Sequence, residues 1–220
     1  MRLYPFITSL LILFLSYYPT YYHWRQTPPD RVWAGTTFFS DDYAVYLHTI
    51  HQGMNRGDLP GRWTVMNKFT SEPHQGSFLH IYYLLAGKFF GLLHISPIAT
   101  YHILRIIASI ATISAAWLFT KTVLKDKFLQ NLAWTFILFS GLLPAKLLGG
   151  VTNNWLPLID EPDVTIRFAA QSHHTLGSAF ILLNLSLFLR YLQNPSNKLL
   201  ALAGIISFLN SLIEPNTAFA

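Results

Sequence analysis

Two adjacent carboxylates, Asp41 and Asp42, are the side chains of this sequence best suited to catalysis. They follow the first apolar stretch of the chain and begin a segment in which apolar residues recur at helical spacing. A carboxylate pair in this place could bind a divalent cation or accept a proton from an attacking hydroxyl group. Capping and the helix dipole also favour acidic residues at a helix start, so a structural role is the alternative.

Further acidic side chains occur in two other polar segments. Glu72 is held in an extended stretch by the proline that follows it, and it is the third candidate for catalysis. A second acidic cluster contains Asp160, Glu161 and Asp163, and we expect it to bind substrate because the membrane topology derived below places it on the same side as the first. The alternative for this cluster is a solvated run of surface charge.

Arg105 and three histidines complete the set of candidate residues. Arg105 lies near one end of an apolar stretch, where a buried cation is costly and is often paired with an anion such as a lipid phosphate. Snorkelling of its side chain to the headgroup region is the alternative. We expect His173 to bind substrate together with Arg105. His48 and His51 could share a helix face as metal ligands beside Asp41 and Asp42, but their spacing defines no third ligand.

The composition is that of a membrane protein. Hydrophobic residues make up 52% of the chain and charged residues 11%, a balance that soluble domains rarely reach. The net charge of +5 comes from scattered lysines and arginines without a recognition motif, so we expect no nucleic-acid partner. The absence of cysteine excludes disulfides and thiolate metal sites, which leaves a divalent metal as the one cofactor that the residues suggest.

Apolar helices must position these side chains. We predict one all-α membrane domain over 1–220, with spans at 3–22, 99–124, 128–148, 174–192 and 199–213. The first stretch lacks a small-residue cleavage site after it, so we interpret it as an uncleaved anchor. The apolar residues Tyr43, Tyr46, Leu47, Ile50 and Met54 predict an amphipathic helix that lies on the membrane beside that anchor.

The short basic loops set the predicted orientation. Lysine and arginine accumulate on the cytoplasmic side, and the loops Lys121 to Lys127 and Arg190 to Lys198 both fall inside only if the stretch 76–95 does not cross. We therefore predict an interfacial or re-entrant helix at 76–95, outer loops at 23–98 and 149–173, and a cytoplasmic N-terminus in the cytoplasmic membrane. An ordinary span with a snorkelling lysine is the alternative for 76–95.

The order of these features resembles a known enzyme class. The matching stretches run from Phe39 through Asp41-Asp42 to Gly57, then from Asn67 to Pro73, followed by the Tyr101 to Arg105 start of a span. Over roughly residues 1–175 the chain resembles the multi-spanning GT-C class of glycosyltransferases, in particular bacterial relatives of the protein mannosyltransferases and the aminoarabinose lipid A transferases. Members of this class are usually much longer, so we expect further spans beyond Ala220.

The resemblance implies sugar transfer from a polyprenyl-phosphate donor to an acceptor at the non-cytoplasmic face of the membrane. Asp41 or Asp42 would be the base or a metal ligand, and Arg105 would match the arginine that opens the second full span. Glu72 would match the acidic residue before proline, although Pro73-His74 stands where a lysine often follows. Asp160, Glu161 or Asp163 would match the acidic position of the second outer loop.

Two other function classes compete with a transferase. A non-enzymatic transporter or flippase component would carry charges near mid-span and internal repeats. The charges of this sequence lie near the outer ends of the predicted spans and no repeat is present, which favours the enzyme. A membrane scaffold whose histidines bind metal is the third alternative.

Overall fold

The computed structural model describes residues 3–35, 40–54, 63–66, 72, 75–139, 168 and 171–214, without the side chains of Ser40 and Asp41. This part of the chain is all-α, as predicted, and residues 65 and 77 form an isolated antiparallel bridge. The helices that it contains are α1 (Leu3–Gln26), α2 (Ser40–Met54), α3 (Ile81–Leu92), α4 (Pro97–Val123), α5 (Lys127–Phe139), α7 (Ser172–Gln193) and α8 (Asn197–Ile213).

Three of these helices, α1, α4 and α7, are long and apolar enough to cross a membrane, which makes this a membrane protein. They cover the spans predicted at 3–22, 99–124 and 174–192. Helix α8 has 17 residues and is shorter than the roughly 20 that a span needs, so the span at 199–213 stays a prediction. The described part of the span predicted at 128–148 ends with α5 at Phe139.

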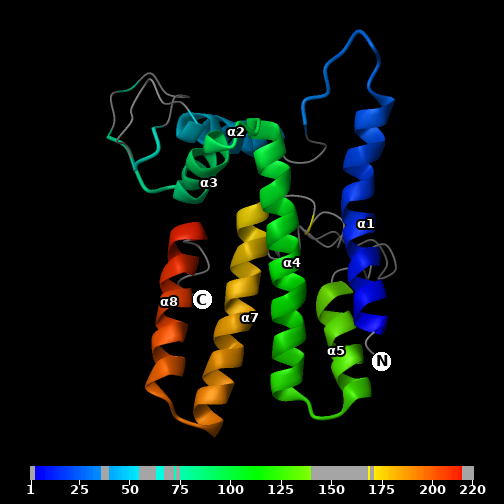
Figure 1. Cartoon of the computed structure of the whole chain (residues 1–220), viewed down its shortest axis with the longest axis vertical. Helices are drawn as coiled ribbons and strands as arrows, with labels where there is room; N and C mark the ends of the chain where they lie inside the picture. Colours follow the sequence, from blue (N-terminus) through cyan, green and yellow to red (C-terminus); the bar gives the residue numbers. More distant parts are fainter. Residues whose placement is uncertain are drawn as a thin grey trace, which may run out of the picture.

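Helices α2 and α3 lie across one end of the bundle rather than within it (Figure 1). Helix α3 has 12 residues and is about 18 Å long, so it is too short to cross a hydrocarbon core of about 30 Å. Two left-handed residues, His80 and His94, stand on either side of it, with φ of 61° and 55°. This length fits the prediction of a segment that does not cross, although its depth in a membrane stays a prediction.

Glycines allow α2 and α3 to touch along their backbones. A Cβ atom added at Gly53 would overlap the carbonyl oxygen of Leu84, and one added at Gly87 would overlap that of Ile50. Helices meet this closely where small residues line both faces. Close packing fixes the last turn of α2 against the middle of α3.

Helix α4 is the central helix of the bundle and packs along α7. The hydroxyl of Thr112 on α4 donates to the carbonyl oxygen of Thr175 on α7, at 2.6 Å. On the other side of α4, the buried Trp134 of α5 donates from its indole nitrogen to the carbonyl oxygen of Ile113, at 3.1 Å. The first of these contacts places the start of α7 beside the middle of α4.

The start of α1, the α4–α5 connection and the α7–α8 connection lie at the same end of the bundle, opposite α2 and α3 (Figure 1). The two connections contain or adjoin basic residues, Lys121, Lys125 and Lys127 in the first and Arg190 and Lys198 in the second. These loop residues lie at one end of the bundle, and the candidate residues Asp42 and His173 lie toward the other, while the orientation in a membrane stays a prediction.

Candidate functional site

The candidate site lies where the start of α7 meets α2 and α3. Asp42, an exposed residue, accepts a hydrogen bond at 2.7 Å from the side-chain amide of Gln171, a buried residue immediately before α7. A hydrogen bond to a charged group contributes about 1.5–3 kcal/mol. The bond fixes one carboxylate oxygen of Asp42 in a defined direction while the residue stays open to solvent.

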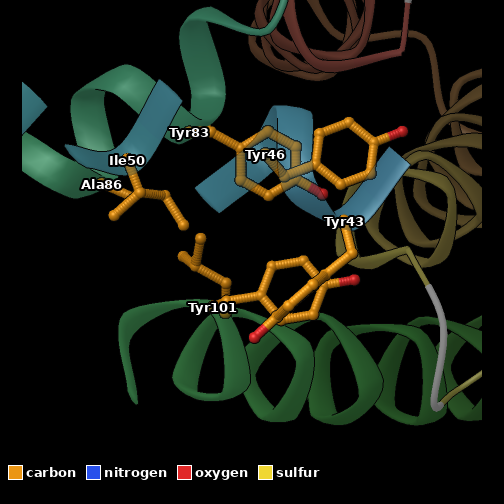
Figure 2. Close-up of a cluster of buried hydrophobic side chains, with 7 residues drawn as sticks. Tyr43, Tyr46, Ile50, Tyr83, Ala86 and Tyr101 are labelled. Atoms are coloured by element: carbon orange, nitrogen blue, oxygen red, sulfur yellow. The ribbon is translucent and has the colours of Figure 1, made fainter. Parts of the chain in front are cut away.

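A layer of tyrosines next to this site joins α2, α3 and α4 (Figure 2). Tyr46 stacks on Tyr83 with ring centroids 4.5 Å apart, and Tyr43 meets the ring of Tyr101 edge-on at 4.8 Å. Burial raises the pKa of Tyr43 to about 12 and also raises the pKa of Tyr46, an effect to which the Asp42 carboxylate adds. These phenols therefore keep their protons near neutral pH and act as hydrogen-bond donors.

Arg105 lies one turn beyond Tyr101 on α4 and is 2% exposed. Its guanidinium lies over the ring of Tyr17, 4.9 Å from the centroid, and its Nη1 donates to Nδ1 of His102 at 2.9 Å. The Nε and Nη2 atoms are buried and have no hydrogen-bond partner within the described part of the chain. Within the same residues no carboxylate forms an ion pair with Arg105. A buried guanidinium in this state is costly unless an anion joins it.

Other buried donors surround Arg105. Because Nδ1 of His102 accepts from the guanidinium, the neutral ring carries its proton on Nε2. The indole nitrogen of Trp33 and the hydroxyl of Tyr43 are buried without a hydrogen-bond partner in the described residues. Trp33 stacks on His102 with centroids 5.8 Å apart, and the Arg105 charge acts on the Tyr43 hydroxyl. The chemistry of this donor set suits an anion with several acceptor oxygens, such as a phosphate.

Two hollows adjoin the site. A pocket of about 230 Å³ lies between α2 and the segments before α3, with His48, Thr49, Ser77 and His80 among its lining residues. Burial lowers the pKa of His80, whereas the charges of Asp42 and Glu214 act in the opposite direction. A larger apolar groove of about 320 Å³ lies between α3 and α8, lined by residues such as Phe89, Phe90, Leu209 and Ile213.

The structure brings together some of the sequence-predicted residues. Asp42, Arg105 and His173 all lie toward the end of the bundle that carries α2 and α3. His48 lines the smaller pocket, whereas His51 and Glu72 are exposed. The side chain of Asp41, and the acidic cluster of Asp160, Glu161 and Asp163, lie outside the described residues. The roles predicted for these residues stay predictions.

Sequence reasoning missed Glu214 and His174. Glu214 ends α8, is 2% exposed, and lies beside both His173 and His174 at the start of α7. An acidic residue at the end of an apolar helix is costly unless it is paired, and this signal was present in the sequence. The partners could not be inferred, because they stand some forty residues earlier on another helix.

Comparison with protein-family models, with curated proteins and with solved structures finds no match for this chain.

Proposed function

We propose that this protein is a membrane glycosyltransferase of the GT-C type, which moves a sugar from a polyprenyl-phosphate donor to an acceptor hydroxyl at the non-cytoplasmic face. The observation that carries the proposal is the buried Arg105 with its unpartnered donor atoms, one helical turn from Tyr101, whose ring contacts Tyr43, the residue after Asp42. Transfer from a phosphate-linked sugar needs a cation for the leaving group and a base for the acceptor.

Arg105 supplies the cation. As the bond between the sugar and the phosphate breaks, negative charge develops on the phosphate oxygen that leaves. The Nε and Nη2 atoms of Arg105 present two parallel N–H donors, the arrangement that holds phosphate in a bidentate way. The Tyr43 hydroxyl and the Trp33 indole add neutral donors. In a low-dielectric site, hydrogen-bond donors that are already oriented toward the phosphate stabilise the developing negative charge far better than water does.

Asp42 supplies the base. The acceptor hydroxyl gives its proton to the carboxylate, the acceptor oxygen bonds to the anomeric carbon, and the sugar–phosphate bond breaks with its electron pair on the phosphate. Gln171 holds one carboxylate oxygen at 2.7 Å, so the other oxygen is directed toward the acceptor. Asp41 is the neighbouring candidate for this role, or for holding a divalent metal.

The lipid part of the donor has a matching surface. The groove between α3 and α8 is lined by apolar side chains, and it includes Leu104, the residue that precedes Arg105. A polyprenyl chain in this groove would place its phosphate end near α4. We expect the acceptor to enter from the solvent-exposed side of Asp42.

A matched pair of lipids tests the donor site. Polyprenyl phosphate at a hundredfold excess over its dissociation constant should stabilise the purified protein by about 2.7 kcal/mol, which corresponds to a rise of about 5–11 °C in unfolding temperature. Polyprenol has the same tail without the phosphate, and it should give a much smaller rise. Equal shifts with both lipids would show that the protein recognises only the tail, which would contradict the proposed phosphate site.

The orientation can be tested with single cysteines, because the natural chain has none. Two variants, Gln75→Cys and His94→Cys, place a cysteine at an exposed position on either side of α3. Two others, Asp126→Cys and Asn194→Cys, place one in each of the loops at the other end of the bundle. In intact cells an impermeant maleimide should label positions 75 and 94, and positions 126 and 194 only after permeabilisation. Labelling of position 75 without position 94 would mean that α3 crosses the membrane.

A further inference from the structure

His173 and His174 at the start of α7 and Glu214 at the end of α8 form a compact group. The Nδ1 atom of His174 lies 2.7 Å from Oε2 of Glu214, and the Nε2 atom of His173 lies 3.6 Å from the same oxygen. One ligand atom from each of the three residues lies within 4.8 Å of the others. His173 and Glu214 are buried, whereas the side chain of His174 is 41% exposed.

The donor set is that of a transition-metal site. Two imidazole nitrogens and one carboxylate oxygen are typical ligands of Zn²⁺. In a tetrahedral site with metal–ligand distances of about 2.0–2.1 Å, neighbouring ligand atoms lie about 3.3 Å apart. The observed separations lie on both sides of this value, so side-chain rotations can close the site around an ion. The exposed edge of His174 leaves room for water as the fourth ligand.

Neighbouring groups orient His173. Its Nδ1 lies 2.9 Å from the hydroxyl of Tyr83, which also accepts a hydrogen bond from Ser172 at 3.1 Å. If Nε2 binds a metal, Nδ1 carries the ring proton and donates it to the Tyr83 oxygen. Metal-bound histidines almost always have such a partner for their second nitrogen. Tyr83 and Ser172 therefore hold the ring in a suitable position for metal binding through Nε2.

A glycine allows α8 to reach α7 at this point. A Cβ atom added at Gly177 would lie 3.1 Å from Cβ of Glu214 and 3.2 Å from its Cγ, which is tighter than ordinary packing. The carboxylate is thereby buried beside two imidazoles. A divalent cation bound here would be held by the carboxylate and both imidazoles together.

We propose that His173, His174 and Glu214 bind a divalent transition-metal ion of the Zn²⁺ type, which joins the start of α7 to the end of α8. The site is distinct from the Asp42 carboxylate and from the Arg105 donors, and the proposal does not depend on the transfer reaction. Oxygen-preferring ions such as Mg²⁺ and Ca²⁺ fit the two-nitrogen set poorly.

Metal titration of the purified chain in detergent tests the site. After treatment with a chelator, the protein should bind one equivalent of Zn²⁺, and Co²⁺ should give the visible absorption of a four-coordinate complex. His174→Ala and Glu214→Gln should each weaken binding by about 100-fold or more, and Tyr83→Phe by about 10- to 100-fold. His23→Ala is the matched control, since this exposed histidine lies on α1 outside the group, and it should bind as the natural protein does.

The outcomes separate a metal site from a metal-free ion pair between His174 and Glu214. Unchanged binding in His174→Ala and Glu214→Gln, or no stoichiometric Zn²⁺ in the natural protein, would overturn the proposal. Equal affinity for Mg²⁺ and Zn²⁺ would also overturn it. Because a ligand variant could fail to fold, Tyr83→Phe, which leaves all three ligands in place, gives a second reading. A tenfold weaker Zn²⁺ affinity in that folded variant would support the site, and an unchanged affinity would count against it.

Discussion

Replacing Asp42 with asparagine should reduce sugar transfer by about 100- to 10,000-fold, the range that a general base contributes. Asparagine has nearly the same shape but cannot accept the proton of the acceptor hydroxyl. Its side-chain oxygen can still accept the hydrogen bond from Gln171, so the fold around the start of α7 should persist. The measurement is the initial rate of release of polyprenyl phosphate from a polyprenyl-phosphate sugar by the purified protein in liposomes.

Asp126→Asn is the matched control for this change. Asp126 accepts a hydrogen bond from the backbone of Leu129 at the start of α5, at the opposite end of the bundle, and asparagine caps helices equally well. That variant should transfer sugar at the natural rate. Asp41→Asn determines which of the two adjacent carboxylates is the base. If Asp41→Asn and Asp42→Asn both leave the rate unchanged, the catalytic assignment is wrong.

Replacing Arg105 with methionine should lower transfer by about 100- to 1,000-fold, as the loss of a donor to developing negative charge does elsewhere. The same change should leave the unfolding temperature unchanged or raise it. Replacing a buried charge with an apolar side chain of similar length is often neutral, or stabilising by about 1–4 kcal/mol. Loss of activity together with retained stability is the signature of a residue kept for function rather than for folding.

Lys121→Met provides the comparison for Arg105. Lys121 is an exposed cation near the other end of α4, 5.9 Å from the ring centroid of Trp117, and its loss removes the same charge from the same helix. We expect it to keep full activity. A clear fall in the stability of Arg105→Met with proportionate loss of activity would instead show that Arg105 is structural, held by Tyr17 and His102.

The sequence was sufficient to predict the all-α fold and its long apolar helices. Apolar length identifies α1, α4 and α7, and helical spacing from Tyr43 to Met54 identifies α2. The positions of the basic loops predicted that 76–95 does not cross; the helix in this segment, α3, has 12 residues, and its placement in a membrane stays a prediction. These features depend on local composition, which a single sequence shows directly.

The contacts within the site could not be predicted. The hydrogen bond between Asp42 and Gln171 joins residues 129 positions apart, and the approach of Glu214 to His174 depends on the space left by Gly177. Arg105 was identified from its place in an apolar stretch, but its unpartnered donors follow from the three-dimensional positions of Trp33, Tyr43 and His102. Such arrangements are set by helix packing, and periodicity in one sequence does not encode which helices are neighbours.

The most direct test is a turnover assay with sealed liposomes that contain the purified protein. Donors with a radioactive sugar on polyprenyl phosphate are added together with lipid and peptide acceptors that carry hydroxyl groups. They are added on the side of the membrane where the maleimide reacts with His94→Cys. A transferase should release one polyprenyl phosphate for each glycosylated acceptor, and Asp42→Asn and Arg105→Met should abolish both products together. Movement of the intact sugar lipid to the other leaflet, with no glycosylated product from any donor, would identify a transporter and contradict the proposed function.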